Sequence, residues 1–181
     1  MEFQNWTIDH IDMILPEEFH ELIASNKKHI SKTFPETSGN CSDLDATVLF
    51  IKNCIVNQKI KENYYFYLRS SETKKLIGYV CIKKIDYKIM KCELAYFIDS
   101  NYEGKGIISQ TVSNTIDFCF NELQMSKICI CTSKINIASQ SVATKYGFQQ
   151  EGILREEFKN DEGILEDIVY FGLLKSEYHE R

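Results

Sequence analysis

The chain has 181 residues, of which 44% are hydrophobic, 12% aromatic and 26% charged. This length suits one domain, which buries about 70% of the surface of its unfolded chain and needs no disulfide or metal for stability. The hydrophobic content, together with only 8 Gly and 2 Pro, excludes a disordered or a collagen-like chain. We therefore expect a single domain over residues 1–181.

The charges are unevenly distributed. The net charge is −5 at pH 7, which argues against a general nucleic-acid binder, because phosphate contacts need a basic surface. Residues 1–26 carry six acids and no Lys or Arg, residues 27–150 carry 17 bases against 11 acids, and residues 151–181 carry nine acids against four bases. This pattern favours a polyanionic ligand for the middle of the chain and a cationic partner for its ends.

The seven cysteines contain no C-x-x-C pair, and two of them, Cys129 and Cys131, lie in an apolar run. We expect buried, reduced thiols in a cytoplasmic protein and no metal site, because the ligand spacing of a zinc centre is absent. No apolar stretch approaches the length of about 18 residues that a membrane span needs, and no signal peptide is evident at the N-terminus.

The first part of the chain predicts a strand and two helices. Residues 6–15 mix apolar and polar side chains, which we interpret as a strand. Pro16 suits the first position of a helix, and Glu17 and Glu18 favour the positive end of its dipole. Ser42 or Asp43 could cap a second helix. Its predicted apolar face consists of Leu44, Val48, Ile51 and Ile55.

The period then changes to strands. Residues 64–68, 76–82 and 92–98 predict an antiparallel meander. Apolar residues spaced by three and four predict a helix from Ile108 to Leu123. The short apolar run 128–131 is typical of a strand buried on both faces, so that this helix completes one β-α-β unit.

The last part of the chain predicts a short helix and two strands. The helix covers about residues 138–145 and ends at Gly147, which suits the position after a helix. Strands are expected over residues 148–154 and 168–174, with a polar, acidic loop between them.

A glycine turn lies between the third strand of the meander and the following helix. Residues 99–108 read DSNYEGKGII. A turn that opens a helix points backbone N–H groups outward at the positive end of the helix dipole, and glycine lets a phosphate approach them. The segment is not a P-loop, and Ser109 stands where a dinucleotide fingerprint has its third glycine. By itself the turn is equally compatible with a plain strand-to-helix connection.

Two motifs carry a family resemblance. Asn101-x-x-Gly104-x-Gly106 resembles the pyrophosphate loop of the GNAT N-acetyltransferases, [RQ]-x-x-G-x-[GA], with Asn101 departing at its first position. Residues 136–152 resemble N-x-x-S-x-x-V-A-x-K-x-G-F-x-x-E-G, a pattern of the ribosomal-protein N-terminal acetyltransferase branch, the RimJ/RimL type. The likeness runs from about Trp6 to Tyr178 and is diffuse before Tyr64.

The resemblance implies the fold and the cofactor. The fold is a mixed α/β, three-layer arrangement with a central, mostly antiparallel twisted sheet, one β-α-β unit and a splayed parallel strand pair. The cofactor is acetyl-CoA. The backbone amides of the loop hold its pyrophosphate, and the preceding strand pairs with its pantetheine arm. The side chain of Asn136 bonds to the amides of that arm. The implied cofactor-binding residues are Phe97, Ile98, Asn101, Glu103, Gly104, Lys105, Gly106, Ile107, Asn136 and Ser139.

The resemblance also implies catalytic roles. Many GNAT enzymes carry a tyrosine as general acid where this chain has Ala143, and the RimL type has a serine, which Ser139 matches. Glu93 matches a carboxylate that accepts the amine's proton through water, and burial in a wedge would raise its pKa and help it act as a base. Glu157, in the expected acidic loop, is a second candidate for the base. Each of these residues also has a structural alternative. Asn136 could cap the short helix, Phe97 could pack in the core, and Glu93 and Glu157 could be solvated carboxylates.

The implied reaction is direct attack of a primary amine on the thioester. The acidic ends of the chain favour cationic acceptors in general. The resemblance to the RimJ/RimL branch ranks the N-terminal α-amine of a ribosomal protein first among them. Small cationic amines such as a polyamine, an aminoglycoside or a toxin are the alternative, and a non-catalytic acyl-CoA sensor on the same fold is another. The oligomeric state stays open, with a homodimer as one option.

Overall fold

The computed structural model describes residues 5–31, 33–160 and 162–179. Seven strands form one sheet in the order β1-β2-β3-β4-β5-β7-β6, and the chain divides into two compact units. Unit 1 comprises residues 1–81 and 96–108, and unit 2 comprises residues 82–95 and 109–181. Pairs β1/β2, β5/β7 and β6/β7 are antiparallel, whereas β4/β5 is parallel. The predicted mixed α/β fold with one β-α-β unit is confirmed.

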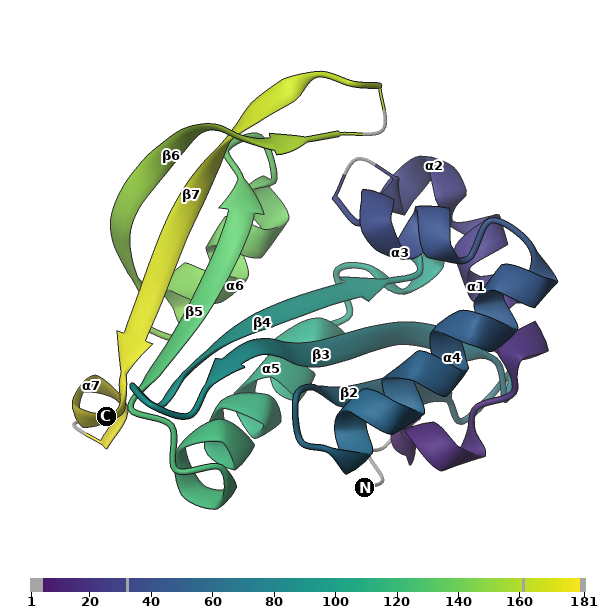
Figure 1. The fold of residues 1–181 in the computed structure, drawn as a ribbon, viewed down its shortest axis with the longest axis horizontal. Coiled ribbons are helices and arrows are strands. Elements are labelled where there is room, and N and C mark those ends of the chain that lie inside the picture. The colour runs from purple at the N-terminus through teal and green to yellow at the C-terminus, as the bar shows by residue number, and fades with distance from the viewer. Residues whose placement is uncertain (1–4, 32, 161, 180–181) are drawn as a thin grey trace. The chain divides into compact units, whose positions relative to one another are not determined.

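Unit 1 holds the helices of the first part of the chain. Its elements are β1 (Trp6–His10), η1 (Ile11–Met13), α1 (Pro16–Ser25), α2 (Lys27–Ile30), α3 (Pro35–Asn40), α4 (Leu44–Lys59), β2 (Tyr64–Ser70) and parts of β3 (Leu76–Asp86) and β4 (Lys91–Ile98). Helix α4 lies across β2 (Figure 1). The predicted strand 6–15 is too long, because the chain turns at η1 to bury Ile11 and leaves Met13 exposed. The short helices α2 and α3 were not predicted.

An aromatic cluster joins the helices of unit 1 to its strands. The ring of Phe19 in α1 lies 5.7 Å from Phe50 in α4, 5.4 Å from Tyr67 in β2 and 5.9 Å from Tyr79 in β3, measured between ring centroids. Such ring pairs add specific geometry to the burial of apolar area. The cluster therefore fixes how α1 and α4 pack on β2 and β3.

The N-terminal end of α4 confirms one prediction and corrects another. The Asp43 side chain caps the helix by accepting a hydrogen bond of 2.8 Å from the backbone N–H of Ala46. The buried face consists of Thr47, Ile51 and Cys54, whereas Leu44, assigned to that face from the sequence, is 40% exposed. The buried residue at the centre of this difference is Thr47, whose hydroxyl donates to the Asp43 carbonyl. A prediction from the spacing of apolar residues does not include a threonine, so it assigned the wrong face.

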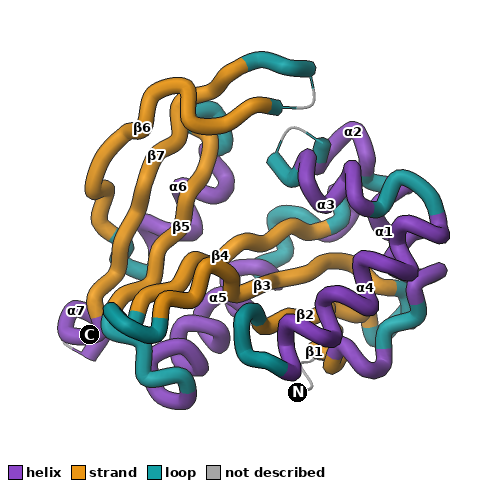
Figure 2. Tube along the Cα trace, in the orientation of Figure 1, coloured by secondary structure: helices purple, strands orange, loops and turns teal. Residues whose placement is uncertain are grey.

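Unit 2 contains the β-α-β unit and a long hairpin. Its elements are α5 (Ile107–Asp117, from Ser109), η3 (Phe118–Glu122), β5 (Lys127–Ser133), α6 (Ile137–Lys145), β6 (Gln149–Lys159), β7 (Leu165–Leu174) and α7 (Lys175–His179). Pairing of β4 with β5 covers Lys91–Leu94 against Lys127–Ile130. Figure 2 shows β5, β6 and β7 as neighbouring strands. The last turn of the predicted helix 108–123 is η3, a π-helical turn rather than an α-helical one.

The hairpin of β6 and β7 corrects the prediction of a long acidic loop. Both strands extend into the segment expected to be a loop, so that only residues 160–164 connect them. The register of β6 shifts between Leu154 and Phe158, and Glu156 has a left-handed backbone, with φ 53°. A bulge shifts the side chains that follow it relative to the faces of the sheet. The charged, mostly exposed strand β6 therefore shows no regular alternation of apolar and polar residues in its sequence.

The buried thiols are confirmed. All seven cysteines are free, and six are buried, while Cys131 is half-buried. Within the described residues, no helix is long and apolar enough to cross a membrane, and no three His, Cys, Asp or Glu side chains gather as a metal-binding group.

A close backbone approach in unit 1 requires a glycine. A Cβ placed on Gly78 of β3 would lie 2.8 Å from the carbonyl oxygen of Phe97 and 3.2 Å from the Cα of Ile98, both in β4. Backbone atoms cannot give way as a flexible side chain can. Gly78 therefore sets the spacing of β3 and β4 just before the glycine turn.

We predict that Gly78→Ala destabilises the protein by about 1–3 kcal/mol, because the methyl group must displace the β4 backbone. Gly39→Ala is the matched control in the same unit, since nothing lies within 4 Å of a Cβ there. Chemical denaturation of both variants measures the difference. Equal stability of the two would contradict the close approach.

Candidate active site

The glycine turn is anchored by side chains of unit 1. After β4, Asp99 donates its backbone N–H to the Ile77 carbonyl at 2.7 Å and caps η2 (Ser100–Tyr102). Its Oδ1 accepts from the backbone N–H and the side chain of Asn101, at 2.8 and 2.9 Å. Asn26, only 3% exposed at the end of α1, donates to Asp99 Oδ2 and accepts from the Ser100 N–H, both at 3.1 Å. The start of the turn is thus held on two sides.

The glycines leave the backbone open. Gly104 and Gly106 have φ values of 70° and 78°, which side chains rarely tolerate, and a Cβ at either would meet nothing within 4 Å. Within the described residues, no hydrogen bond is donated by the backbone N–H groups of residues 104–106. Helix α5 begins directly afterwards at Ile107. Outward N–H groups at a helix start suit a phosphate, so the residues fit the pyrophosphate of a CoA molecule.

The other side chains predicted to bind the cofactor in unit 1 have structural partners. Glu103 Oε1 lies 3.2 Å from His29 Nε2, and the Lys105 ammonium lies 4.6 Å from the ring centre of Tyr102. The Phe97 ring packs against Phe34 and Tyr79, while Ile98 and Ile107 belong to the cluster of Trp6, Leu68 and Ile77. Phe97 and Ile98 can therefore offer a ligand only their backbone.

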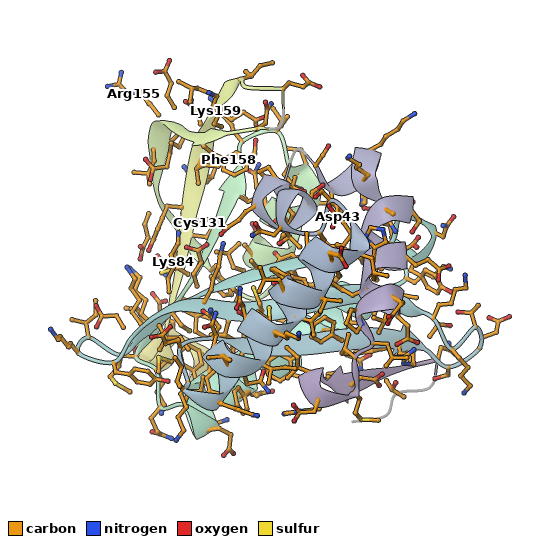
Figure 3. The ribbon with its side chains drawn as sticks, turned by 45° about the vertical axis from the view of Figure 1, so that its right-hand side comes forward. Asp43, Lys84, Cys131, Arg155, Phe158 and Lys159 are labelled. Carbon is orange, nitrogen blue, oxygen red and sulfur yellow. The ribbon has the colours of Figure 1, made fainter. Side chains whose placement is uncertain are left out.

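Unit 2 places Glu93 between two consecutive lysines. Its carboxylate lies 3.2 Å from Lys83 Nζ and 2.9 Å from Lys84 Nζ, and its side chain is only 9% exposed. Adjacent residues of a strand normally point to opposite faces, but Lys84 has φ 50°, which turns both ammonium groups to one carboxylate. Figure 3 labels Lys84 and Cys131. Burial, and then the charge of Glu93, raise the pKa of the Cys131 thiol to about 12.

The electrostatics of Glu93 correct a prediction. Burial raises the pKa of this carboxyl, but the charges of Lys83 and Lys84 and their hydrogen bonds outweigh burial, so the pKa lies below its ordinary value. The raised pKa expected for a general base is therefore wrong. Both carboxylate oxygens of Glu93 are engaged in ion pairs, so neither is free to accept a proton from a water molecule.

The start of α6 positions two further residues. Asn136 caps this helix through its Oδ1, which accepts from the backbone N–H of Ser139 at 3.1 Å. The structural role expected for Asn136 is thus present. The cap uses only its oxygen and leaves the amide nitrogen as a donor. Ser139 is half-buried in the first turn of α6.

Glu157 lies in β6 and not in a loop, which corrects the prediction. It is exposed, close to the bulge at Glu156. Lys84 connects this residue electrostatically to the Glu93 cluster, because the pKa of Lys84 is raised first by its hydrogen bond to Glu93 and also by the charge of Glu157. Glu93 and Glu157 therefore influence the same ammonium group.

Sequence reasoning missed three positioning groups. Asn26 lies in a segment with no motif, and Lys83 and Lys84 extend β3 beyond its apolar run. The sequence signal for the lysines is that two of them are consecutive and precede the strand that carries Glu93. This signal is weak, because the contact of both lysines with Glu93 depends on the left-handed backbone of Lys84, which the sequence does not indicate.

Residues 3–149 match the family model described as an acetyltransferase (GNAT) domain. The chain belongs to this family. Its GNAT relatives include the uncharacterized N-acetyltransferase p20 of Bacillus licheniformis, 34% identical over 59% of this chain and 60% of the relative. The ribosomal-protein-serine acetyltransferase of Escherichia coli is 26% identical over 78% of both chains. The spermidine N(1)-acetyltransferase of Vibrio cholerae is 30% identical over 60% of this chain and 62% of the relative.

Solved GNAT structures share the fold. The ribosomal-protein-S5-alanine acetyltransferase of Vibrio fischeri superposes with a TM-score of 0.88 at 21% identity, covering 98% of this chain and 97% of that one. The chain aligns with 56–62% of the length of the first curated relatives it matches. The family and the fold are thereby shown.

We predict that Glu93→Gln lowers stability by about 1–2 kcal/mol at pH 7, because it removes the carboxylate that two lysines face. The folded-state pKa of Glu93 is lowered, so its contribution is present above the ordinary value of 4.5 and is lost as the pH falls through the folded-state pKa. Denaturation of the wild type and the variant across pH measures this. A difference that persisted unchanged at strongly acidic pH would contradict the ion-pair assignment.

Proposed function

We propose that the protein transfers the acetyl group of acetyl-CoA to a primary amine. The observation that carries this proposal is the open glycine turn at the start of α5, in a chain of the GNAT family. Among solved neighbours, the microcin C7 self-immunity acetyltransferase MccE is described in complex with acetyl-CoA and AMP, and RimL in complex with coenzyme A. In the reaction the amine forms a C–N bond to the acetyl carbon while the C–S bond of the thioester breaks.

The binding roles divide between backbone and side chains. The N–H groups of residues 104–106 are proposed to hold the pyrophosphate, where the glycines leave room for it. The backbone of Phe97 and Ile98 is proposed to pair with the pantetheine arm, since their side chains are committed to the core. The Asn136 amide nitrogen donates to the arm. The side chain of Asn101, which bonds to Asp99, is proposed to support the turn.

The proton transfers are assigned to the accessible groups. Glu157 is exposed and is proposed to accept the proton that the amine loses. Glu93, with both oxygens in ion pairs, is proposed to position Lys83 and Lys84 instead. Ser139 is proposed to pass a proton to the departing thiolate and to regain one from solvent, to which Glu157 releases the proton of the amine. This is the role that the resemblance implies where the family's tyrosine is replaced by Ala143. These assignments rest on exposure and pairing together with the family resemblance.

For the acceptor, we propose the N-terminal α-amine of a ribosomal protein. The motif in residues 136–152 and the E. coli ribosomal-protein-serine acetyltransferase support this choice. A polyamine is the second candidate, because a spermidine N(1)-acetyltransferase is also a relative. The exposed carboxylates of the β6–β7 hairpin, Glu156, Glu157 and Glu162, favour a cationic acceptor of either kind.

We predict that Gly104→Ala weakens acetyl-CoA binding at least about tenfold, because the methyl group occupies the space of the pyrophosphate and its left-handed backbone is strained. Gly163→Ala is the matched control, since Gly163 has a similar φ of 81° and no proposed contact. Isothermal titration calorimetry of both variants separates ligand contact from backbone strain. Equal affinity of the two variants would refute the turn as the pyrophosphate site.

We predict that Ser139→Ala and Glu157→Gln each lower kcat at least about tenfold without a comparable loss of acetyl-CoA affinity. Thiol release with a panel of ribosomal-protein N-terminal peptides and polyamines measures turnover and ranks the acceptors. Lys88→Gln, a change of an exposed turn residue, should retain the wild-type rate. Acetyl-CoA binding with no release in any arm would support the sensor alternative and overturn the enzyme proposal.

A further inference from the structure

Two consecutive carboxylates lie near the start of β7 in unit 2. Glu166 and Asp167 follow the first residue of this strand, and both are half-buried. In the sequence they belong to the segment predicted as an acidic loop. Adjacent residues of a strand point to opposite faces of the sheet, so the two side chains make different contacts.

Asp167 holds the bulge of β6. Residues 155–157 of β6 lie opposite the single residue Asp167, because the ladder pairs on the two sides of the bulge are shifted. A bulge leaves backbone groups without their partners in the ladder. Asp167 Oδ1 accepts a hydrogen bond of 3.1 Å from the N–H of Glu156, the residue with the left-handed backbone. A side chain thus takes the place of a missing ladder contact.

Glu157 follows directly after the residue that Asp167 holds. Figure 3 labels Arg155 and Phe158, the residues on either side of Glu156 and Glu157. A residue other than glycine at a φ of 53° is uncommon, and it persists where the surrounding structure fixes it. A bulge also re-aims the side chains beside it. The hydrogen bond to Asp167 therefore sets the direction in which the Glu157 carboxylate leaves the strand.

Glu166 fixes the turn of the hairpin to β5. One of its carboxylate oxygens accepts from the Ser133 hydroxyl, and the other accepts from the Asn160 amide nitrogen at 2.8 Å. Asn160 is buried, and its side-chain oxygen accepts from the N–H groups of Glu162 and Ile164, at 3.0 and 2.9 Å. The turn is thereby held against the last residue of β5.

The backbone of β7 at the same point fixes the segment that leads into α6. The carbonyl of Asp167 accepts from the N–H of Lys134 at 3.0 Å, directly after β5. Two residues later, Asn136 caps α6 and holds the backbone of Ser139. Asp167 therefore contacts two segments of unit 2: the hairpin that carries Glu157 and the turn that leads to α6.

We propose that Asp167 is a positioning residue for acetyl transfer, which sets Glu157 of the hairpin relative to Ser139 of α6. This rests on the proposed function, in which Glu157 accepts the proton of the amine. A group misplaced by about 1 Å can lower a rate by a factor of about 100, so the base needs a fixed position. Asp167 itself contacts neither substrate nor cofactor in this role, and Glu166 supports it by fixing the turn of the hairpin.

The first experiment tests the contact without an acceptor. Amide hydrogen exchange of Glu156 is measured by NMR in the full chain for the wild type, Asp167→Ala, Asp167→Asn and Glu122→Ala. Asparagine keeps the Oδ1 acceptor and loses only the charge, and Glu122 is an exposed acid of the same unit that serves as control. We expect exchange about fivefold faster in Asp167→Ala alone. Equal exchange in Asp167→Ala and the wild type would overturn the proposal.

The second experiment tests the reaction. Thiol release gives kcat with the fastest acceptor among ribosomal-protein N-terminal peptides and polyamines, and calorimetry gives the acetyl-CoA affinity. We expect kcat to fall about tenfold in Asp167→Ala with unchanged acetyl-CoA affinity, to fall less in Asp167→Asn, and to stay at the wild-type value in Glu122→Ala. A loss in Asp167→Asn as large as in Asp167→Ala would contradict positioning through the hydrogen bond.

A double-mutant cycle separates positioning from a general structural effect. If Asp167 acts through Glu157, then Asp167→Ala lowers kcat little further in the Glu157→Gln background, so the two losses do not multiply. Losses that multiply would overturn the proposal. A wild-type kcat in Asp167→Ala beside a low kcat in Glu157→Gln would overturn it too, and would leave the proposed function intact. A wild-type kcat in Glu157→Gln would refute the base assigned in the proposed function, and the positioning role with it.

Discussion

The glycine turn depends on one buried amide. Asn26 ends α1, is nearly inaccessible to solvent, and uses both ends of its side chain to hold Asp99 and Ser100. A buried amide left without partners is costly, so this pair of hydrogen bonds strongly favours one position of the turn. Asp99 in turn holds Asn101, and the chain then passes through the two left-handed glycines into α5. These hydrogen bonds hold the start of the turn, and the two glycines after it leave the backbone open to a ligand.

Charge is arranged differently in unit 2. Glu93 and Glu151 each satisfy their lysines directly, so that these parts of unit 2 are electrostatically complete without a ligand. Lys145 is exposed to solvent and bonds to the Ser109 hydroxyl and not to a carboxylate. The pairing of Glu93 and Glu151 with lysines assigns both carboxylates to the stability of the fold. It also explains why a buried glutamate in a catalytic family need not be the base.

The sequence was sufficient for the fold class and for the glycine turn, because both depend on local signals. Alternation, helical spacing and the two glycines act within a few residues. The face of α4 was misassigned because a buried threonine satisfies its own hydroxyl, and the hairpin was misread because its strands are charged and bulged. The lowered pKa of Glu93 could not be predicted, since it depends on the left-handed backbone of Lys84, a residue type that usually avoids this conformation.

The bulge of β6 has a consequence for self-association. β6 is the last strand in the order of the sheet, and an edge strand offers unpaired backbone groups to any other extended chain. The register shifts and the left-handed Glu156 interrupt the straight run of donors and acceptors that such pairing needs. The charges of Arg155, Glu157 and Lys159 disfavour an approaching apolar strand. The hairpin can therefore keep a long, exposed edge without becoming a template for aggregation.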